Sequence, residues 1–371
     1  MTTRFYTGIA EAPRKPLSER PPPAYEVHRK GRYRPDPGLA AAANVAILLG
    51  QPLLLTGEPG TGKTRFAYAM ASELGLGEVL ECFVKSSTSA KDLFYSFDEL
   101  ARFRDIHANE HLPLQRYLSF HGLGKAILFA GGPDRALKVL PGRAFESAPS
   151  RGLSKEPVLA RRDAAAGRPQ TFGDLYPATA FPPNGPRASV VLVDELDKAP
   201  RDTPNDMLNE IERLGFDIPE LGVRVEVPGD ATVRPIVVIT SNSEKSLPDP
   251  FLRRCVYFDI PFPVDDLREI VYAQVCWLTE GMLLDEALEV FALLRDRSRI
   301  QRPPGTAELL AWLDVLGYDA MKPADSLRDR FRGTTDKDLE IVQATLATLA
   351  KRPEDRATAS DILRSWSTDT R

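Results

Sequence analysis

The stretch GEPGTGKT, residues 57–64, combines the residue types that bind phosphate. Glycines let the backbone bend so that several N–H groups point at one anion. Lys63 adds a positive charge for terminal phosphates, and Thr64 adds a hydroxyl ligand for Mg²⁺. An apolar run precedes the stretch and helix-forming residues follow it, which is the setting of a phosphate-binding loop. The pattern predicts a nucleotide site formed by Gly57, Glu58, Pro59, Gly60, Thr61, Gly62, Lys63, Thr64 and Arg65.

A second group of candidate residues lies in VVLVDELDKAP. Asp194 ends an apolar run and is predicted to hold Mg²⁺ through its water shell, while Glu195 is predicted to polarise an attacking water. An acidic pair at a strand end is also common as a solvent-facing terminus. Because a phosphate loop lies upstream, we favour the catalytic interpretation.

Two further segments carry side chains suited to hydrolysis. Asn242 follows the apolar run PIVVIT, where an amide could orient both the water and the terminal phosphate. Its alternative role is an ordinary turn or helix N-cap. Arg253 and Arg254 close the segment DPFLRR and suit either a surface cation or an arginine that reaches a phosphate in a neighbouring subunit.

Composition limits the classes of function. The chain has 371 residues and a formal net charge of -4, so neither anionic membrane nor nucleic acid is an expected direct partner. Cys82, Cys255 and Cys276 are too widely spaced for a CxxC metal site and suit a reducing compartment. No apolar run approaches the roughly 20 residues of a membrane span. We therefore expect a cytoplasmic protein.

Apolar segments predict the central elements. Residues 52–56, 79–84, 189–194, 235–240 and 255–260 are short and rich in branched side chains, which is typical of strands covered on both faces. Helix formers occupy residues 39–49 before Gly50, and residues 63–74 after the loop. Together they predict an α/β fold with a parallel sheet and flanking helices.

Other segments suggest the domain boundaries. Residues 1–37 contain seven prolines and are predicted to form an extended N-terminal segment. Residues 38–262 are predicted to form the α/β nucleotide-binding part, and residues 263–371 a helical part with a polar tail. Residues 131–187 show little periodicity and are predicted to be a flexible insert. Its arginines could touch a polyanion, but a solvated segment is the preferred interpretation: Arg143, Arg151, Arg161 and Arg162.

The ordered set of motifs resembles an AAA+ ATPase, and within that class the MoxR-like family. The resemblance spans roughly residues 39–350 and rests on GEPGTGKT, VLVDELDKAP, NDMLNEIERLGFDIPELGVRVEV, ITSNSEKSLPDPFLRRCVYFDIPFP and RPPGTAELLAWL. It implies a P-loop NTPase fold with a five-stranded sheet in the order 5-1-4-3-2, a C-terminal helical lid, and ATP with Mg²⁺ bound between them. It also implies a homo-oligomeric ring, usually a hexamer, and a β-hairpin insert at residues 216–229.

The resemblance assigns roles to individual residues. Lys63 and Thr64 match the Walker A pair, Asp194 and Glu195 the Walker B pair, and Asn242 the sensor-1 residue. Arg254 matches the arginine finger, with Arg253 as its close rival. Where relatives carry a sensor-2 arginine this chain has Leu309, and Arg302 is a possible substitute. Tyr33 and Val264 are candidates for purine contacts, and a preference for ATP over GTP is not determined.

Three functions are compatible with these residues. The first is an ATP-driven ring that remodels or activates client proteins, possibly together with a von Willebrand factor A domain partner, as the MoxR-like resemblance implies. The second is the motor subunit of a McrB-like restriction or defence complex, for which DNA would raise turnover. The third is a nucleotide-gated scaffold that hydrolyses little. Glu195 argues against a scaffold, and the absence of the sensor-2 arginine argues for one.

Overall fold

The computed structural model describes residues 33, 35–110, 112–140, 169–229, 231, 233–242, 247–296, 300–318, 321–332 and 345–369. Two compact units make up the chain. The sheet unit comprises Pro35–Gly57 and Phe66–Ile260, and the helical unit comprises Met1–Arg34, Glu58–Arg65 and Pro261–Arg371. Most of the predicted N-terminal segment at 1–37 lies outside the described residues, as do Arg143, Arg151, Arg161 and Arg162.

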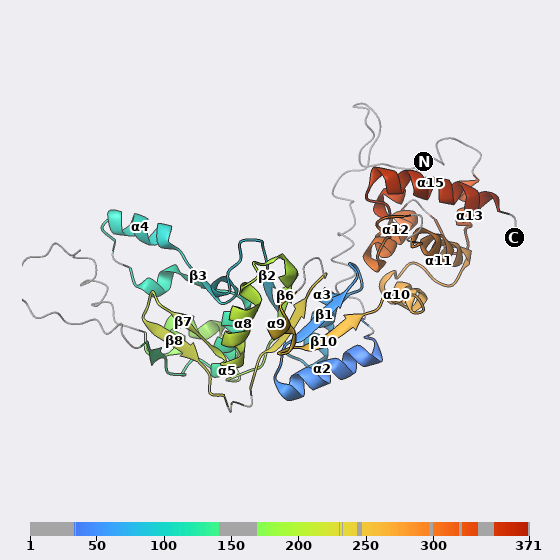
Figure 1. The fold of residues 1–371 in the computed structure, drawn as a ribbon. Coiled ribbons are helices and arrows are strands. Elements are labelled where there is room, and N and C mark those ends of the chain that lie inside the picture. Colours follow the sequence, from blue (N-terminus) through green and yellow to red (C-terminus); the bar gives the residue numbers. More distant parts are fainter. Residues whose placement is uncertain are drawn as a thin grey trace, which may run out of the picture. The chain divides into compact units, whose positions relative to one another are not determined.

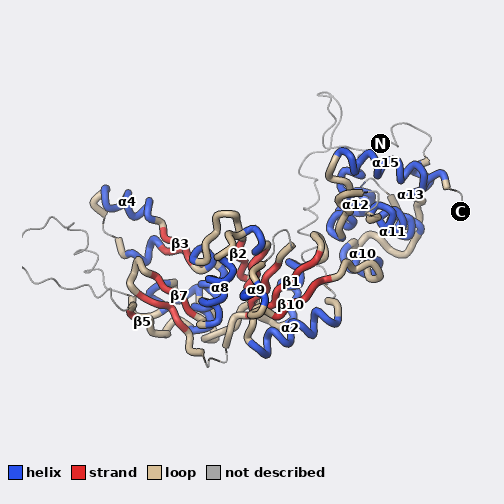
Figure 2. Tube along the Cα trace, in the orientation of Figure 1, coloured by secondary structure: helices blue, strands red, loops and turns tan. Residues whose placement is uncertain are grey.

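A five-stranded parallel sheet forms the centre of the sheet unit (Figures 1 and 2). Its strands in chain order are β1 (Leu53–Gly57), β2 (Leu80–Phe83), β6 (Val190–Asp194), β9 (Ile236–Thr240) and β10 (Val256–Ile260). Their order in space is β10-β1-β9-β6-β2. Numbered along the chain this order is 5-1-4-3-2, so the predicted fold class is confirmed. Four strands lie within the segments predicted for them, and β1 extends one residue further, to Gly57.

The register of the sheet places three strand ends at one edge. Leu55 of β1 pairs with Thr240 of β9, and Val193 of β6 pairs with Ile239 of β9. Because all the strands are parallel, the residues that follow β1, β6 and β9 leave the sheet on the same side. This edge positions the predicted site residues.

Buried aliphatic side chains explain why β1 and β6 are internal strands of the sheet. Leu53, Leu54 and Leu55 of β1 are at most 1% exposed, and Val190, Val191 and Val193 of β6 are fully buried. Helix α2 (Pro37–Leu49), which the sequence placed from Leu39, lies against β1 and β10, and α5 (Gly122–Gly131) lies against β2 and β6. Helices α3 (Lys63–Glu73), α8 (Thr203–Glu212) and α9 (Asp249–Leu252) follow β1, β6 and β9 along the chain.

Two smaller sheets extend the sheet unit. Strands β7 (Gly215–Ile218) and β8 (Val223–Glu226) form an antiparallel hairpin after α8, in the interval where a hairpin insert is expected. Strand β5 (Lys138–Val139) pairs with β8. Strands β3 (Tyr95–Phe97) and β4 (Leu118–Phe120) flank α4 (Glu99–His107) and were not predicted. Their shortness explains the omission, because three residues carry almost no periodic signal.

The expectation of a flexible insert at residues 131–187 is wrong for its described ends. Besides β5, these ends form α7 (Phe172–Leu175) and a short 3₁₀ turn at Ala178–Ala180. Phe172 is fully buried, and Phe181 is 6% exposed and packs near Phe129 with ring centroids 5.9 Å apart. Isolated aromatic residues anchor this segment to the core without any repeat that a sequence pattern would reveal.

The helical unit contains α10 (Leu267–Gln274), α11 (Met282–Leu294), α12 (Thr306–Tyr318), α13 (Leu327–Phe331) and α15 (Pro353–Thr368), with a 3₁₀ turn at Leu346–Thr348. One apolar cluster holds them together around the fully buried Trp312, whose ring N–H donates to the Thr345 hydroxyl at 3.1 Å. The sequence predicted this helical part from residue 263. In the part of the chain that the structure describes, no helix has the length and apolarity to cross a membrane.

Candidate functional site

The phosphate loop runs from Gly57, the last residue of β1, to Lys63, the first residue of α3. Inside the loop the Glu58 carbonyl accepts hydrogen bonds from the Thr61 hydroxyl at 2.9 Å and from the Lys63 ammonium at 3.0 Å. Lys63 is 6% exposed. In this structure the loop therefore holds the Lys63 ammonium against its own backbone.

Residues Glu58–Arg65 pack with the helical unit instead of the sheet unit, which corrects the expectation that all of 38–262 forms one part. Close backbone approach is the cause. A Cβ on Gly60 would lie 3.3 Å from Gly305 Cα and 3.3 Å from Thr306 N, and a Cβ on Gly305 would lie 2.7 Å from the Pro59 carbonyl oxygen. The start of α12 thus fits against the loop only because both positions are glycine.

Arg295 binds the same loop and was missed by the sequence analysis. Its guanidinium forms an ion pair with Glu58 Oε2 at 2.7 Å and donates to the Pro304 carbonyl at 2.6 Å. The guanidinium carbon lies 3.2 Å from the ring centroid of Phe262. The side chain is only 15% exposed, so these contacts fix it firmly in place. No motif surrounds Arg295, and only the fold brings it to Glu58.

Leu309 and Arg302, the two positions that the sequence analysis compared with a sensor-2 arginine, have different surroundings. Leu309 is fully buried in the apolar cluster of the helical unit and presents no polar group. Arg302 is exposed, and its backbone N–H donates to Asp355 at 3.3 Å. Among these three positions in the described residues, Arg295 is the one that contacts the phosphate loop.

Tyr33 also lies against the loop, because a Cβ on Gly62 would be 3.0 Å from its ring atom Cε2. Burial lowers the pKa of the Arg65 guanidinium, and the nearby Tyr33 partly offsets this. Val264 is 65% exposed. The structure thus puts Tyr33 beside the loop, whereas Val264 has an open surface position.

Three polar residues predicted from the sequence lie close together at one edge of the sheet: Asp194, Glu195 and Asn242. The Thr240 hydroxyl donates to Asp194 Oδ1 at 2.6 Å and accepts the backbone N–H of Glu195 at 2.8 Å. Thr240 is 1% exposed, so this bridge is shielded from water. It fixes Asp194 and Glu195 from the neighbouring strand β9, a role that the sequence analysis did not assign to Thr240.

Glu195 has an unusual backbone and two side-chain partners. Its φ of 57° lies in the left-handed region, which is uncommon for a residue with a side chain and is frequent at functional sites. Oε1 accepts the Asn242 side-chain N–H at 3.2 Å, and Oε2 forms an ion pair with Lys198. The structure therefore brings Asn242 to Glu195, as expected from the ends of neighbouring strands.

The two candidate arginines occupy different surroundings. Arg254 donates to Asn209 Oδ1 of α8 at 2.9 Å and lies 3.6 Å from Glu212 Oε1. Arg253 caps α9 with its backbone N–H donating to the Asp249 carbonyl at 3.1 Å, and its exposed side chain has no hydrogen-bond or ion-pair partner within the described ranges. The Arg254 side chain is thus held by α8 of the same chain, whereas the Arg253 side chain is exposed.

The described residues contain no ready-made cluster of metal ligands. Among the described residues no three His, Cys, Asp or Glu side chains converge to hold a metal. Mg²⁺ usually combines one or two protein oxygens with substrate phosphates and water. Thr64 at the start of α3 and Asp194 at the end of β6 each carry an oxygen donor of that kind.

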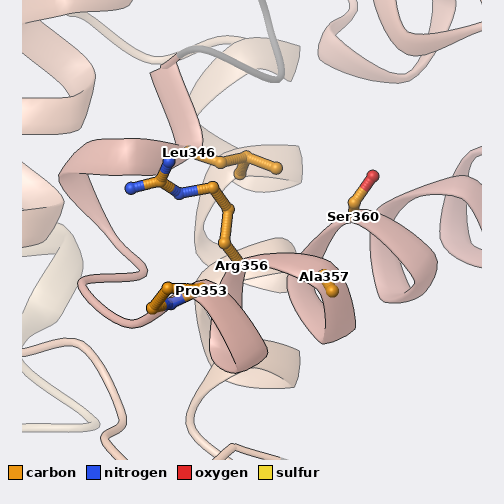
Figure 3. Close-up of a pocket in the computed structure, with 5 residues that line it drawn as sticks. All are labelled: Leu346, Pro353, Arg356, Ala357 and Ser360. Carbon is orange, nitrogen blue, oxygen red and sulfur yellow. The ribbon is translucent and has the colours of Figure 1, made fainter.

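A shallow hollow in the helical unit has a different character (Figure 3). It measures about 310 Å³ and is lined by Leu346, Pro353, Arg356, Ala357 and Ser360. Pro353, Arg356 and Ala357 are exposed, so their polar groups are already solvated. Its residues offer no buried donor or acceptor for a ligand.

No protein-family model and no curated protein matches this sequence. Among solved structures, the RuvB Holliday junction branch migration motor of Thermotoga maritima is similar, with 18% identity and a TM-score of 0.37, over 83% of this chain and 66% of that chain. NtrX from Brucella abortus is similar with 11% identity and a TM-score of 0.40, over 92% of this chain and 65% of that chain. Similarities at these identities and TM-scores carry no argument about function. The function is therefore argued from the geometry of the site.

Proposed function

We propose that this chain is an AAA+ ATPase that binds ATP with Mg²⁺ and hydrolyses it. The observation that carries this proposal is the Asp194–Thr240–Glu195–Asn242 cluster, at the edge of the sheet from which the phosphate loop also begins. The 5-1-4-3-2 strand order supports the same class. A magnesium ion bound with the nucleotide would neutralise charge on the phosphates.

Each residue has a definite task in this proposal. Lys63 and the loop N–H groups bind the phosphates, Thr64 and Asp194 hold the metal, and Gly57–Arg65 wraps the nucleotide. Glu195 takes the proton of the attacking water, and Asn242 orients that water by a hydrogen bond. The left-handed backbone of Glu195 and its bond to Asn242 aim the carboxylate before substrate arrives.

We further propose that the active form is a hexameric ring that remodels or activates a protein client in the cytoplasm, in the manner of MoxR-like ATPases. The exposed Arg253, with Arg254 as the alternative, would complete the site of a neighbouring subunit. The net charge of -4 favours a protein client over a nucleic-acid track. An adaptor with a von Willebrand factor A domain is the partner we would test first.

The test is ATP hydrolysis by the full chain with Mg²⁺, in the presence and absence of saturating DNA. We expect hydrolysis that Lys63→Ala abolishes, with no stimulation by DNA. A binding measurement with a non-hydrolysable ATP analogue in the same samples separates loss of affinity from loss of chemistry. Binding without hydrolysis in the wild type would indicate a scaffold, and stimulation by DNA would favour a McrB-like motor.

A further inference from the structure

The 3₁₀ turn that follows the acidic pair, Leu196–Lys198, carries a carboxylate that the proposed hydrolysis does not use. Asp197 is 3% exposed. Its Oδ1 accepts the backbone N–H of Asn242 at 3.2 Å, but its Oδ2 is buried without a hydrogen-bond partner in the part of the chain that the structure describes. Burying a carboxylate oxygen without a partner is costly, so this oxygen needs an explanation, and a bound cationic group would supply one.

A pocket of about 250 Å³ adjoins this carboxylate, and Asp197 is one of its lining residues. The other walls are mainly apolar and come from two segments of the sheet unit: Leu196, Pro200, Pro204, Leu247 and Pro248. Proline has no backbone N–H and therefore cannot satisfy Asp197 from the wall. The pocket thus pairs one buried negative oxygen with rigid apolar sides.

The residues that line this pocket indicate which kind of ligand it can bind. A bare metal ion would need several oxygen ligands, and Asp197 is the single carboxylate among the pocket residues. A long cationic side chain meets both requirements, because its methylene stem packs on proline and leucine while its charged head donates to a carboxylate. We propose that this pocket binds one arginine or lysine side chain of a partner protein.

The pocket is connected to the proposed catalytic base. The Asn242 backbone N–H donates to Asp197 Oδ1, and the Asn242 side chain donates to Glu195 Oε1 at 3.2 Å. A cation on Oδ2 would therefore act on the residue that orients Glu195. This gives a partner a physical route to influence hydrolysis, although binding itself does not depend on the proposed ATPase activity.

A competing explanation is that the chain supplies its own cation. Arg201 also lines the pocket, is exposed, and stands four residues after Asp197. It forms no ion pair with Asp197 in the described structure, but a rotamer change could bring them together. Arg201→Gln is therefore the matched control, because it removes this cation and leaves the carboxylate.

The experiment follows the methyl resonances of Leu196 and Leu247 in the full chain by NMR during titration with N-acetyl-arginine methylamide. The citrulline analogue, which is neutral and nearly isosteric, is the control ligand. We expect saturable shifts with arginine but not with citrulline. Asp197→Asn keeps the Oδ1 acceptor for Asn242 and should weaken arginine binding about tenfold or more, the loss expected for a charge-assisted hydrogen bond. Arg201→Gln should bind at least as well as wild type.

Several outcomes would overturn the proposal. Two of them are shifts with the citrulline analogue as large as those with arginine, and arginine binding to Asp197→Asn as tight as to wild type. The other two are loss of arginine binding in Arg201→Gln, and the absence of any shift with arginine in the wild type. A melting temperature clearly lower in Asp197→Asn than in wild type would mean that the folded chain already satisfies Oδ2. Sedimentation of wild type and Asp197→Asn tests which protein supplies the cation. Unchanged assembly in the variant supports a separate partner protein. Loss of assembly in the variant would assign the cation to a second copy of this chain and reject the partner.

Discussion

At the residue scale, Glu195 is held by groups from two strands and its own turn, so its carboxylate can be tested by an isosteric change. Glu195→Gln keeps the shape but cannot accept a proton. We expect ATP affinity to be retained and turnover to fall by about 10²–10⁴-fold. Single-turnover hydrolysis and equilibrium binding measure the two effects. Glu73→Gln, exposed at the end of α3, is the control. Unchanged turnover in Glu195→Gln would contradict its role as the base.

Thr240 supplies a second residue-scale prediction, because its hydroxyl joins Asp194 to the Glu195 backbone. Thr240→Val preserves volume but leaves the buried Glu195 N–H without an acceptor, a loss of about 1–3 kcal/mol. We expect lower unfolding free energy in urea and reduced turnover. Thr240→Ser retains the hydroxyl and should resemble wild type in turnover. If valine and serine variants hydrolyse equally, the hydroxyl bridge does not position the acidic pair.

At the element scale, the helical unit holds the phosphate loop through the end of α11 and the start of α12. Arg295 pairs with Glu58, and Gly305 packs on Gly60. Because the pair is only partly exposed, Arg295→Gln and Glu58→Gln should each reduce stability, and their effects should be coupled by about 0.5–3 kcal/mol. A double-mutant cycle in urea measures the coupling, and ATP titrations of the same variants show whether nucleotide affinity follows it. Strict additivity would mean that the ion pair does not restrain the loop.

At the scale of the whole molecule, the exposed Arg253 and the tethered Arg254 suggest a site completed only by assembly. We expect the hydrolysis rate per subunit to rise with protein concentration as large assemblies form. Light scattering on the same samples checks the mass. A constant rate from a monomer would remove the shared arginine from the mechanism.

Assemblies that mix subunits of two variants test whether Arg253 or Arg254 acts in the site of a neighbouring subunit. We expect Arg253→Ala to abolish turnover, and Lys63→Ala subunits, which keep Arg253, to restore part of it. Arg254→Ala should instead destabilise the contact with α8 and gain nothing from mixing. The opposite pattern would make Arg254 the shared residue.

The sequence by itself determined the central sheet and most of the proposed site. Continuous apolar runs identified β1, β6 and β9, because buried parallel strands need apolar side chains on both faces. The edge strands β2 and β10 were identified from shorter apolar segments and are only partly buried. The loop and the acidic pair were identifiable since their chemistry requires particular residue types at fixed spacing. Asn242 was identifiable because polar residues after neighbouring parallel strands leave the sheet at one edge.

Only the tertiary structure decided the contacts between residues distant in the sequence. Thr240 looked like the last residue of a strand until the register placed it between Asp194 and Glu195. Arg295 lies 237 positions from Glu58 and has no motif of its own. Asp197 differs from an ordinary surface acid only by its burial. Local patterns encode local structure and strand burial, whereas ion pairs and pockets arise when the packed core brings separate segments together.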